Sequence, residues 1–419
     1  MKLKSNILKL RRNGRTVYSA RTDAVHNELQ RINKEVINKY GLKIPNRNAI
    51  IKTIIQFLSQ GEIYSNRKEL PLTPLNFKVI KMDIKNYFPS INKHILYSKI
   101  VRSSILNDSS IETIKSFIFS NAYMGIPLGL AFSNSLSELY LEEFDSAIQL
   151  NWQPLLYVRY VDDILLIVNE RIDENEVVEF VKKELKNYHL EVNDTKTDFQ
   201  VSSNQFSFTY LGYKFSKFQK KTLNSKGKIK HENYLFINIS EKKFNEKILN
   251  KLVRYFKRFK RNYRQSESFW ILYYRLKNLI HGVSSKGENN QVVKFGLSYS
   301  YGFINSEDEL IKFLRMYHYF IRYYRQNGYL SSRQAYLLTS IVSADKKVVT
   351  SYSSRDDILS LLNNRYHYEK LSVKTLEKIC LRIGVPYTSK VYTNKYLDFH
   401  KINLQKKIMK KLSLRFGND

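Results

Sequence analysis

The chain of 419 residues is long enough for two or three subdomains, and 43% of its residues are hydrophobic, which is enough to build a core for each. Lys and Arg total 70 against 38 acids, a net charge of +32, and the basic excess is densest after Ser240. A compact protein this basic favours a polyanion partner, and nucleic acid is the expected one. The single cysteine excludes a disulfide framework, and the eight histidines lack the spacing of a metal site.

The N-terminus is basic but lacks the apolar stretch of a secretory signal, and no apolar run reaches the length needed to span a membrane. The sequence therefore favours a cytoplasmic protein in a reducing compartment. There we expect Cys380 to be a buried, inert thiol.

Residues 24–60 carry apolar positions at helical spacing and predict two helices separated by Pro45 and Asn46. The next region, up to 239, alternates short apolar strands with turns and predicts a mixed region with an antiparallel sheet. From Ser240 onward the patterns are helical, and the Gly-, Ser- and Asn-rich segment 282–296 predicts a linker. We therefore expect an α+β protein with a mixed region at 1–239, a helical segment at 240–285 and a basic helical region at 286–419.

Two apolar, strand-like runs at 155–161 and 164–168 are joined by Asp162 and Asp163. This pattern predicts a β-hairpin with two carboxylates at its tip. Such acids are costly to bury between apolar strands unless cations compensate them, and hard divalent cations prefer oxygen ligands. The alternative is a solvated turn; for the similar pair Asp356 and Asp357, after Ser354, we expect only a capped helix start.

Upstream, the segment 79–91 places Asp83 at the end of an expected strand, shortly before a turn at Pro89. If this strand pairs with the hairpin in one sheet, Asp83 can face Asp162 and Asp163. Three carboxylates could then chelate two cations, which orient a triphosphate and activate an attacking hydroxyl.

These residues resemble motifs A and C of reverse transcriptases: Asp83 is similar to the family's first catalytic aspartate, and Tyr160-Val161-Asp162-Asp163 to its YxDD box. Residues 125–129 look like motif B, 190–197 like motif D and 208–215 like motif E, the primer grip. Five motifs in the family's order argue against coincidence. The resemblance covers about residues 10–285 and implies a right-hand polymerase fold: fingers and palm, then a helical thumb and a helical C-terminal region.

The resemblance implies a nucleotidyltransferase that extends DNA along an RNA template with two Mg²⁺ ions, Mn²⁺ being an alternative. Its metal ligands would be Asp83, Asp162, Asp163 and the main chain of Ile84. Phe88 would lie beneath the sugar and exclude a 2′-hydroxyl, unless it is a plain core aromatic. The other residues expected at the nucleotide are Gly125, Pro127, Lys196 and, unless they are ordinary surface arginines, Arg15 and Arg47; those of the primer grip are Tyr210, Leu211 and Gly212.

Residues 251–264 hold seven basic and no acidic residues, opposite an apolar stripe. A thumb helix along a duplex backbone would present such a face, although a merely solvated basic face is an alternative. Arg275 and His281 have a spacing found in some ribonuclease helices, which we interpret as coincidence. The nucleic-acid contacts expected from the thumb are Arg254, Lys257, Arg258 and Arg261.

Leu128 stands where motif B commonly has Gln or a small polar residue, and the chain lacks recognisable retron, zinc-ligand and ribonuclease H segments. It is most similar to the bacterial abortive-infection and defence-associated reverse transcriptases. That likeness implies phage defence in the bacterial cytoplasm, with dNTPs, a DNA primer or product and an RNA template, in some relatives a noncoding RNA. Oligomers and a second protein of the defence system stay open as partners.

Two alternative functions remain at this point. One is template-independent or protein-primed DNA synthesis by the same site, for which tyrosines between Tyr317 and Tyr324 could supply a primer, although packing is the better explanation of those rings. The other is a catalytically silent RNA-binding protein of polymerase fold, against which the three intact acids argue.

Overall fold

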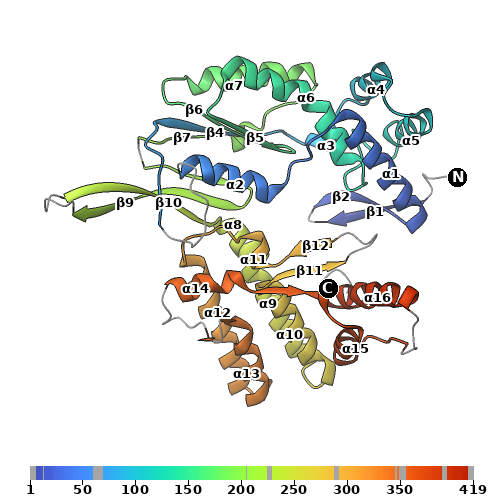
Figure 1. Cartoon of the computed structure of the whole chain (residues 1–419), viewed down its shortest axis with the longest axis vertical. Coiled ribbons are helices and arrows are strands. Elements are labelled where there is room, and N and C mark those ends of the chain that lie inside the picture. Colours follow the sequence, from blue (N-terminus) through green and yellow to red (C-terminus); the bar gives the residue numbers. More distant parts are fainter. Residues whose placement is uncertain are drawn as a thin grey trace. The chain divides into compact units, whose positions relative to one another are not determined.

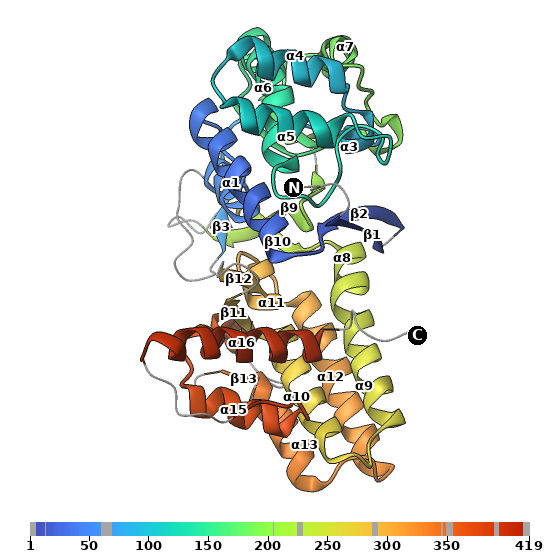
Figure 2. The ribbon, with the colours of Figure 1, turned by 90° about the vertical axis from the view of Figure 1, so that its right-hand side faces the viewer.

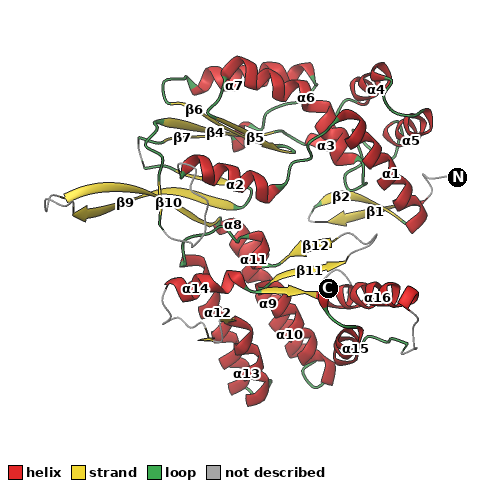
Figure 3. Cartoon of the chain, viewed as in Figure 1, coloured by secondary structure: helices red, strands yellow, loops and turns green. Residues whose placement is uncertain are grey.

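A computed structural model describes residues 6–12, 14–59, 69–203, 205–223, 229–286, 292–344, 347–348, 355–388 and 394–413. The chain divides into two compact units, the first formed by Met1–Gly61 and Leu72–Leu211 and the second by Glu62–Pro71 and Gly212–Asp419. Both units mix helices with antiparallel strands (Figure 3), so the expected α+β class is confirmed.

The elements of the first unit follow one another in this order: β1 (Ile7–Arg12), β2 (Arg15–Ala20), α1 (Asp23–Tyr40), α2 (Arg47–Leu58), β4 (Phe77–Asp83), α3 (Tyr87–Ser90), α4 (Lys93–Ser103), α5 (Asp108–Ile118), α6 (Ser133–Trp152), β5 (Leu156–Tyr160), β6 (Asp163–Asn169), α7 (Glu174–Asn187), the 3-10 turn η2 (Asp194–Lys196), β7 (Asp198–Val201) and β8 (Ser207–Tyr210).

The elements of the second unit are β3 (Leu70–Pro71), β9 (Tyr213–Leu223), β10 (Ile229–Ile239), α8 (Glu241–Phe244), η3 (Asn245–Leu249), α9 (Asn250–Arg261), α10 (Ser266–Ile280), β11 (Gly282–Lys286), β12 (Val292–Phe295), α11 (Leu297–Ser300), α12 (Asp308–Gln326), α13 (Ser332–Thr339), η5 (Ser340–Val342), β13 (Ser343–Ala344), β14 (Lys347–Val348), α14 (Arg355–Ser360), η6 (Leu361–Asn363), β15 (Arg365–His367), η7 (Tyr368–Lys370), α15 (Val373–Arg382) and α16 (Asn394–Leu412).

A four-stranded antiparallel sheet in the order β5-β6-β4-β7 is the centre of the first unit (Figure 1). Along β6, Ile164, Leu166 and Val168 pack into the core that helices α1, α6 and α7 cover. The intervening Leu165 and Ile167 are also buried, on the face of the sheet where Figure 1 shows α2. Burial on both faces explains why β6 is an uninterrupted apolar run.

The two helices expected between residues 24 and 60 are present as α1 and α2. The helix α1 ends at Gly41, whose φ of 62° is the left-handed conformation that glycine adopts readily at a helix end. The side chain of Asn46 accepts hydrogen bonds from the first main-chain N–H groups of α2. The break predicted at Pro45 and Asn46 is therefore confirmed.

In the second unit, α9, α10, α12 and α13 run side by side (Figure 2). The apolar stripe of α9 is buried, and Phe256 stacks on Phe320 of α12 with ring centroids 5.0 Å apart. Cys380 is buried in α15, as expected, and burial raises the pKa of its thiol to about 11. Among the described helices, none is both long and apolar enough to cross a membrane.

The prediction of a linker at 282–296 is wrong. Within it β11 and β12 pair antiparallel, and β11 also pairs parallel with β15; residues 287–291 lie outside the described part. Val283, Ser284 and Ser285 are buried, so serines that suggested a solvated loop belong to an internal strand. The Ser285 hydroxyl and the Lys286 main-chain N–H both donate to the side chain of Gln405, which satisfies polar groups there.

Candidate active site

The strand pairing brings the three predicted aspartates together. Asp83, the last residue of β4, lies opposite Asp163, the first residue of β6. Asp162 lies in the two-residue turn between β5 and β6, and its main-chain carbonyl accepts a hydrogen bond of 2.9 Å from the N–H of Ile84. Opposed residues of antiparallel strands are about 5 Å apart at Cα, so the carboxylates belong to one cluster.

Mutual repulsion and burial change the protonation of this cluster. Burial, followed by the charges of Asp162 and Asp83, raises the pKa of the Asp163 carboxyl to about 6. Burial also raises the pKa of Asp162, and the charges of Arg15 and Lys196 act in the opposite direction. Groups arranged in this way favour a compensating cation.

Asp83 already has one cationic partner. The ammonium of Lys196 lies 2.8 Å from its Oδ1, and the side-chain amide of Asn193 donates to the same oxygen at 3.2 Å. The main-chain N–H of Asn193 also donates to the Asp83 carbonyl at 2.7 Å. The segment that resembles motif D is therefore fastened directly to the end of β4.

A cavity of about 490 Å³ opens beside these acids, entirely within the first unit. Phe88 is half-buried: it packs against the core and also forms part of the cavity wall. Leu128, where the family commonly has a polar residue, is also in the wall. Six of the residues predicted at the nucleotide or the metals line the cavity: Arg15, Asp83, Ile84, Phe88, Asp162 and Lys196. Four others predicted there do not line it: Asp163, Gly125, Pro127 and Arg47.

Gly125 nevertheless determines where Phe88 lies. A Cβ on Gly125 would come within 2.0 Å of the Phe88 carbonyl oxygen, and that oxygen accepts a hydrogen bond from the N–H of Ile126 at 3.0 Å. The φ of Gly125 is also positive, at 58°. The loop at 125–129 can pack on the Phe88 turn only because this residue has no side chain.

The same loop contacts the β1–β2 hairpin. The Leu128 carbonyl accepts a hydrogen bond of 2.7 Å from the N–H of Tyr18, and a Cβ on Gly129 would lie 2.6 Å from the Tyr18 carbonyl. The Tyr18 ring packs edge-on against Tyr123, and both line the cavity. Sequence reasoning missed Tyr18 and Tyr123, because nothing local marks a ring that meets another segment a hundred residues away.

The turn that carries Asp162 is supported from beneath by Arg159. Val161 has a φ of 61°, an outlier for a β-branched residue, and its carbonyl accepts a hydrogen bond of 3.0 Å from Arg159. The Arg159 side chain is 3% exposed, and its guanidinium pairs with Glu138 at 2.7 Å and Asp145 at 2.6 Å. An arginine inside an apolar strand was the available sequence signal, since such a charge requires buried partners.

The segment that resembles motif E also contacts the hairpin. The Tyr210 hydroxyl is buried and donates a hydrogen bond of 2.9 Å to the Asp163 carbonyl. Leu211 and Gly212 follow as a turn with positive φ values of 46° and 85°. Arg47, expected at the nucleotide, donates two hydrogen bonds to the Leu211 carbonyl, at 2.7 and 3.0 Å, so its guanidinium holds this turn.

In the second unit, Arg254, Lys257 and Arg261 are exposed on α9 and Arg258 is partly so. His281 is mostly buried, bonds through Nε2 to the Ile341 carbonyl at 2.9 Å, and burial lowers its pKa to about 4. That environment supports the interpretation of the ribonuclease spacing as coincidence.

The tyrosines considered as primers and the second pair of aspartates both lie in the second unit. Tyr317 is buried and bonded to the Leu338 carbonyl, whereas Tyr319 and Tyr323 are exposed. Asp357 lies in α14, as a helix start requires, while Ser354, its expected cap, lies outside the described residues.

The donor chemistry of the aspartate cluster fits a hard divalent cation, since carboxylate and main-chain oxygens are the ligands that Mg²⁺ prefers. Asp163, whose carboxyl pKa burial and its two neighbours raise, is a position where such a charge would be stabilising. The side chains as they stand are less convergent: no group of three or more His, Cys, Asp or Glu residues in the described part is arranged to hold a metal.

An antiparallel sheet presents acids at the ends of paired strands here, beside a cavity with basic side chains in its wall, and two-metal phosphoryl transfer uses these kinds of group. Residues 16–215 match the family "Reverse transcriptase (RNA-dependent DNA polymerase)". Residues 16–215 thus form a domain similar to the reverse transcriptase family, as the motifs predicted.

No curated protein sequence matches the chain. Among solved structures it is similar to telomerase from Candida tropicalis in complex with a TWJ fragment of telomeric RNA, with 14% identity, a TM-score of 0.37 and coverage of 90% of this chain and 56% of that one. The corresponding Candida albicans complex has 13% identity and a TM-score of 0.34, and the match covers 81% of this chain and 56% of that one. The chain thus spans about half the length of these structures, and similarities this low establish no shared function or partner.

Proposed function

We propose that this protein extends a DNA strand along an RNA template by means of two divalent cations, Mg²⁺ or Mn²⁺, bound by Asp83, Asp162, Asp163 and the main-chain carbonyl of Ile84. The observation that carries this proposal is the strand register, in which Asp83 lies opposite Asp163 and the Asp162 carbonyl is bonded to Ile84. When bound, the cations would activate the 3′-hydroxyl and neutralise the triphosphate.

The other cavity residues are assigned roles that their positions support. Arg15 and Lys196 bring positive charge to the cavity wall beside Asp83 and Asp162, and we assign them to the triphosphate. The Nζ of Lys196 carries protons that can pass to the leaving pyrophosphate. Phe88 is assigned to the face of the sugar, where its ring would clash with a 2′-hydroxyl, and the Gly125–Pro127 main chain to the support of that ring.

For the nucleic acid, we propose that the basic face of α9 binds the duplex backbone through Arg254, Lys257, Arg258 and Arg261, and that the turn at Tyr210, Leu211 and Gly212 holds the primer end. The net charge of +32 supports a backbone-binding surface of this kind. Within this scheme residues 1–239 are fingers and palm, 240–285 the thumb and 286–419 a helical C-terminal domain.

We further propose a role in bacterial defence against phage, in the cytoplasm, with an RNA of the defence system as template. What supports this is the resemblance of a compact motif-bearing region followed by more than a hundred residues of basic helical sequence to the defence-associated reverse transcriptases. Sequencing the nucleic acids that copurify with the protein tests it. Recovery of random cellular RNA with no discrete species would contradict a dedicated template.

Primer extension on an RNA template with dNTPs and Mg²⁺ tests the polymerase. Asp162→Asn should abolish incorporation, whereas Asp357→Asn, in the second adjacent Asp pair of the chain, should leave it unchanged. DNA formed without a template would favour template-independent synthesis. DNA that stays attached to the protein after denaturation, and is released by protease, would favour protein priming. RNA binding without incorporation under any condition would leave a silent binder.

A further inference from the structure

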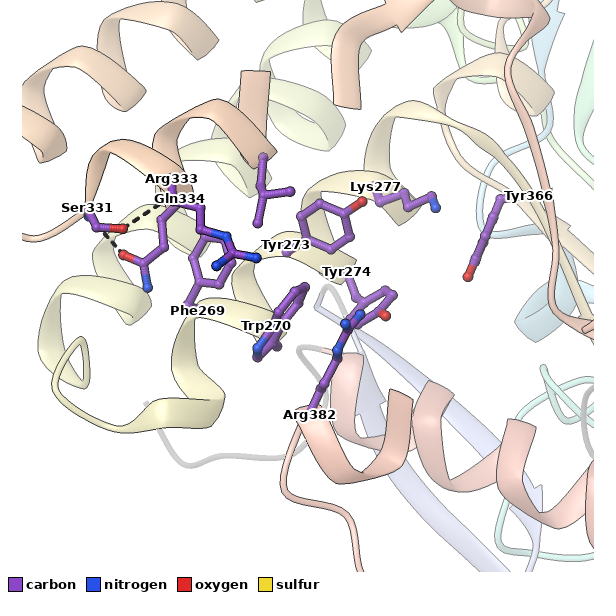
Figure 4. A pocket seen from close by; sticks show the side chains of 11 residues that line it. Phe269, Trp270, Tyr273, Tyr274, Lys277, Ser331, Arg333, Gln334, Tyr366 and Arg382 are labelled. Carbon is purple, nitrogen blue, oxygen red and sulfur yellow. Dashed lines mark hydrogen bonds between the residues drawn. The ribbon is translucent and has the colours of Figure 1, made fainter. Parts of the chain in front are cut away.

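A second cavity, of about 710 Å³, lies entirely in the second unit and contains none of the polymerase motifs. Four elements build it: α10, α13 with its cap, β15 and α15 (Figure 4). Its volume is in the range of sites that hold a small organic ligand. The side chains that matter are Trp270, Tyr273, Lys277, Arg333, Tyr366 and Arg382.

The wall contains three cations and no carboxylate. Within the described parts of the chain, no Asp or Glu lies within ion-pair distance of Lys277, Arg333 or Arg382. Lys277 is mostly buried, and burial lowers the pKa of its ammonium to about 8. A buried charge without a counter-charge destabilises a fold, so an anion would relieve this arrangement.

Aromatic rings line the same space. The guanidinium of Arg382 lies 4.0 Å from the Trp270 ring centre, and the ammonium of Lys277 lies 3.7 Å from that of Tyr366. Trp270, Tyr273 and Tyr366 are only partly buried, and Figure 4 shows them facing the cavity. Exposed rings beside cations are the elements with which proteins stack a base and hold its phosphate.

We propose that this cavity binds an unpaired nucleotide, with its base against Trp270, Tyr273 and Tyr366 and its phosphate against Lys277, Arg333 and Arg382. An inorganic anion would use the cations and leave the rings unused, whereas a neutral aromatic ligand would leave the cations uncompensated. A nucleotide uses both. The bound nucleotide is either a free mononucleotide or an unpaired nucleotide within a strand. The two possibilities differ in whether binding requires the neighbouring nucleotides of the strand.

The site is largely preformed. The capping box at the start of α13 fixes the turn before Arg333: the Ser331 N–H donates to Gln334 at 2.9 Å, and the Gln334 N–H donates to the Ser331 hydroxyl at 3.2 Å (Figure 4). On α10, Trp270, Tyr273 and Lys277 are three and four residues apart and so share one face. Little ordering should therefore oppose binding.

The test uses the full chain with Trp152→Phe, which leaves Trp270 as its only tryptophan. The replacement should be tolerated, because the Trp152 indole N–H is buried without a partner. UMP and a short oligouridylate are titrated without divalent cations, while Trp270 fluorescence is followed. Saturable quenching by UMP supports a free nucleotide as the ligand, and quenching by the oligonucleotide alone supports a strand.

Charge reversal then separates this site from general attraction to a basic protein. Arg333→Glu should weaken oligouridylate binding about tenfold, the loss expected for one charged contact, while Arg322→Glu on α12, with the same charge change on another exposed arginine, should weaken it much less. Arg382→Gln should also weaken it, without reversing a charge. Absence of saturable quenching, or equal losses for Arg333→Glu and Arg322→Glu, would overturn the proposal, and neither result depends on polymerase activity.

Discussion

Arg159→Met tests how far the aspartate cluster depends on the buried cation beneath its turn. The replacement keeps most of the side-chain volume and removes the guanidinium that contacts Glu138, Asp145 and the Val161 carbonyl. Because Glu138 is 10% exposed in its side chain, its carboxylate would remain buried without a counter-charge. Removing one partner of such a pair destabilises by about 3–5 kcal/mol, so we expect a loss of that size at neutral pH.

The loss should depend on pH. Burial already raises the pKa of Glu138, and Arg159 opposes that rise. Without Arg159 the folded-state pKa increases further while the unfolded value stays near 4.5, so the destabilisation is complete above the folded pKa and shrinks as pH falls toward 4.5. The turn at Val161 should also relax, since its left-handed conformation stores about 1–2 kcal/mol, and primer extension by the folded fraction should fall.

Urea unfolding at pH 7 and pH 5, together with primer extension below the unfolding transition, measures both effects. Lys182→Met is the matched control, because Lys182 also contacts two carboxylates, Glu179 at 3.0 Å and Asp194 at 3.2 Å, but at the surface. Exposed pairs contribute about 0–1 kcal/mol. A loss for Arg159→Met no larger than that of the control, or one independent of pH, would refute the reasoning.

Three further outcomes are expected. Lys277→Met should raise the free energy of unfolding by up to about 3 kcal/mol below pH 8, because burial lowers the pKa of the Lys277 ammonium to about 8. The gain should vanish by pH 10.5, where the lysine is neutral in both the folded and the unfolded chain. Urea unfolding across this pH range measures the gain, and its absence would contradict the burial of the charge. Gly125→Ala should reduce dNTP incorporation about tenfold or more in primer extension, while Gly41→Ala, also at positive φ but with open space around it, should not. Phe88→Ala should lower the kcat/KM preference for dNTPs over ribonucleotides about tenfold; an unchanged ratio would remove Phe88 from the sugar.

The sequence identified the parts of the site that depend on local pattern. A strand ending in Asp83 and a hairpin with acids at its tip are recognisable from short apolar runs, whereas the pairing of β4 with β6 was a condition that the sequence left open and the structure meets. The apolar stripe of α9 was equally local. These expectations agree with the structure because each depends on residues close together in the chain.

The parts that were missed depend on contacts between distant segments. Glu138 and Asp145 belong to α6, and only its packing against the sheet shows that they are the partners of Arg159. The sequence placed Arg47 at the nucleotide because its surroundings resemble a basic fingers segment. In the structure its guanidinium donates instead to the carbonyl of Leu211, which lies far away in the sequence. The segment 282–296 was misjudged because serine content says nothing about burial when a neighbouring strand and Gln405 satisfy the polar groups.

Burial acts on groups of opposite charge at the two proposed sites. In the first unit, burial and the charges of the neighbouring aspartates raise the pKa of Asp163, so a cation beside the three aspartates would be stabilising. In the second unit, burial lowers the pKa of Lys277, so that site is stabilised by added negative charge and needs no metal to attract phosphate. We therefore expect divalent cations to strengthen nucleotide binding at the aspartates, whereas the binding proposed at Lys277 should not require them.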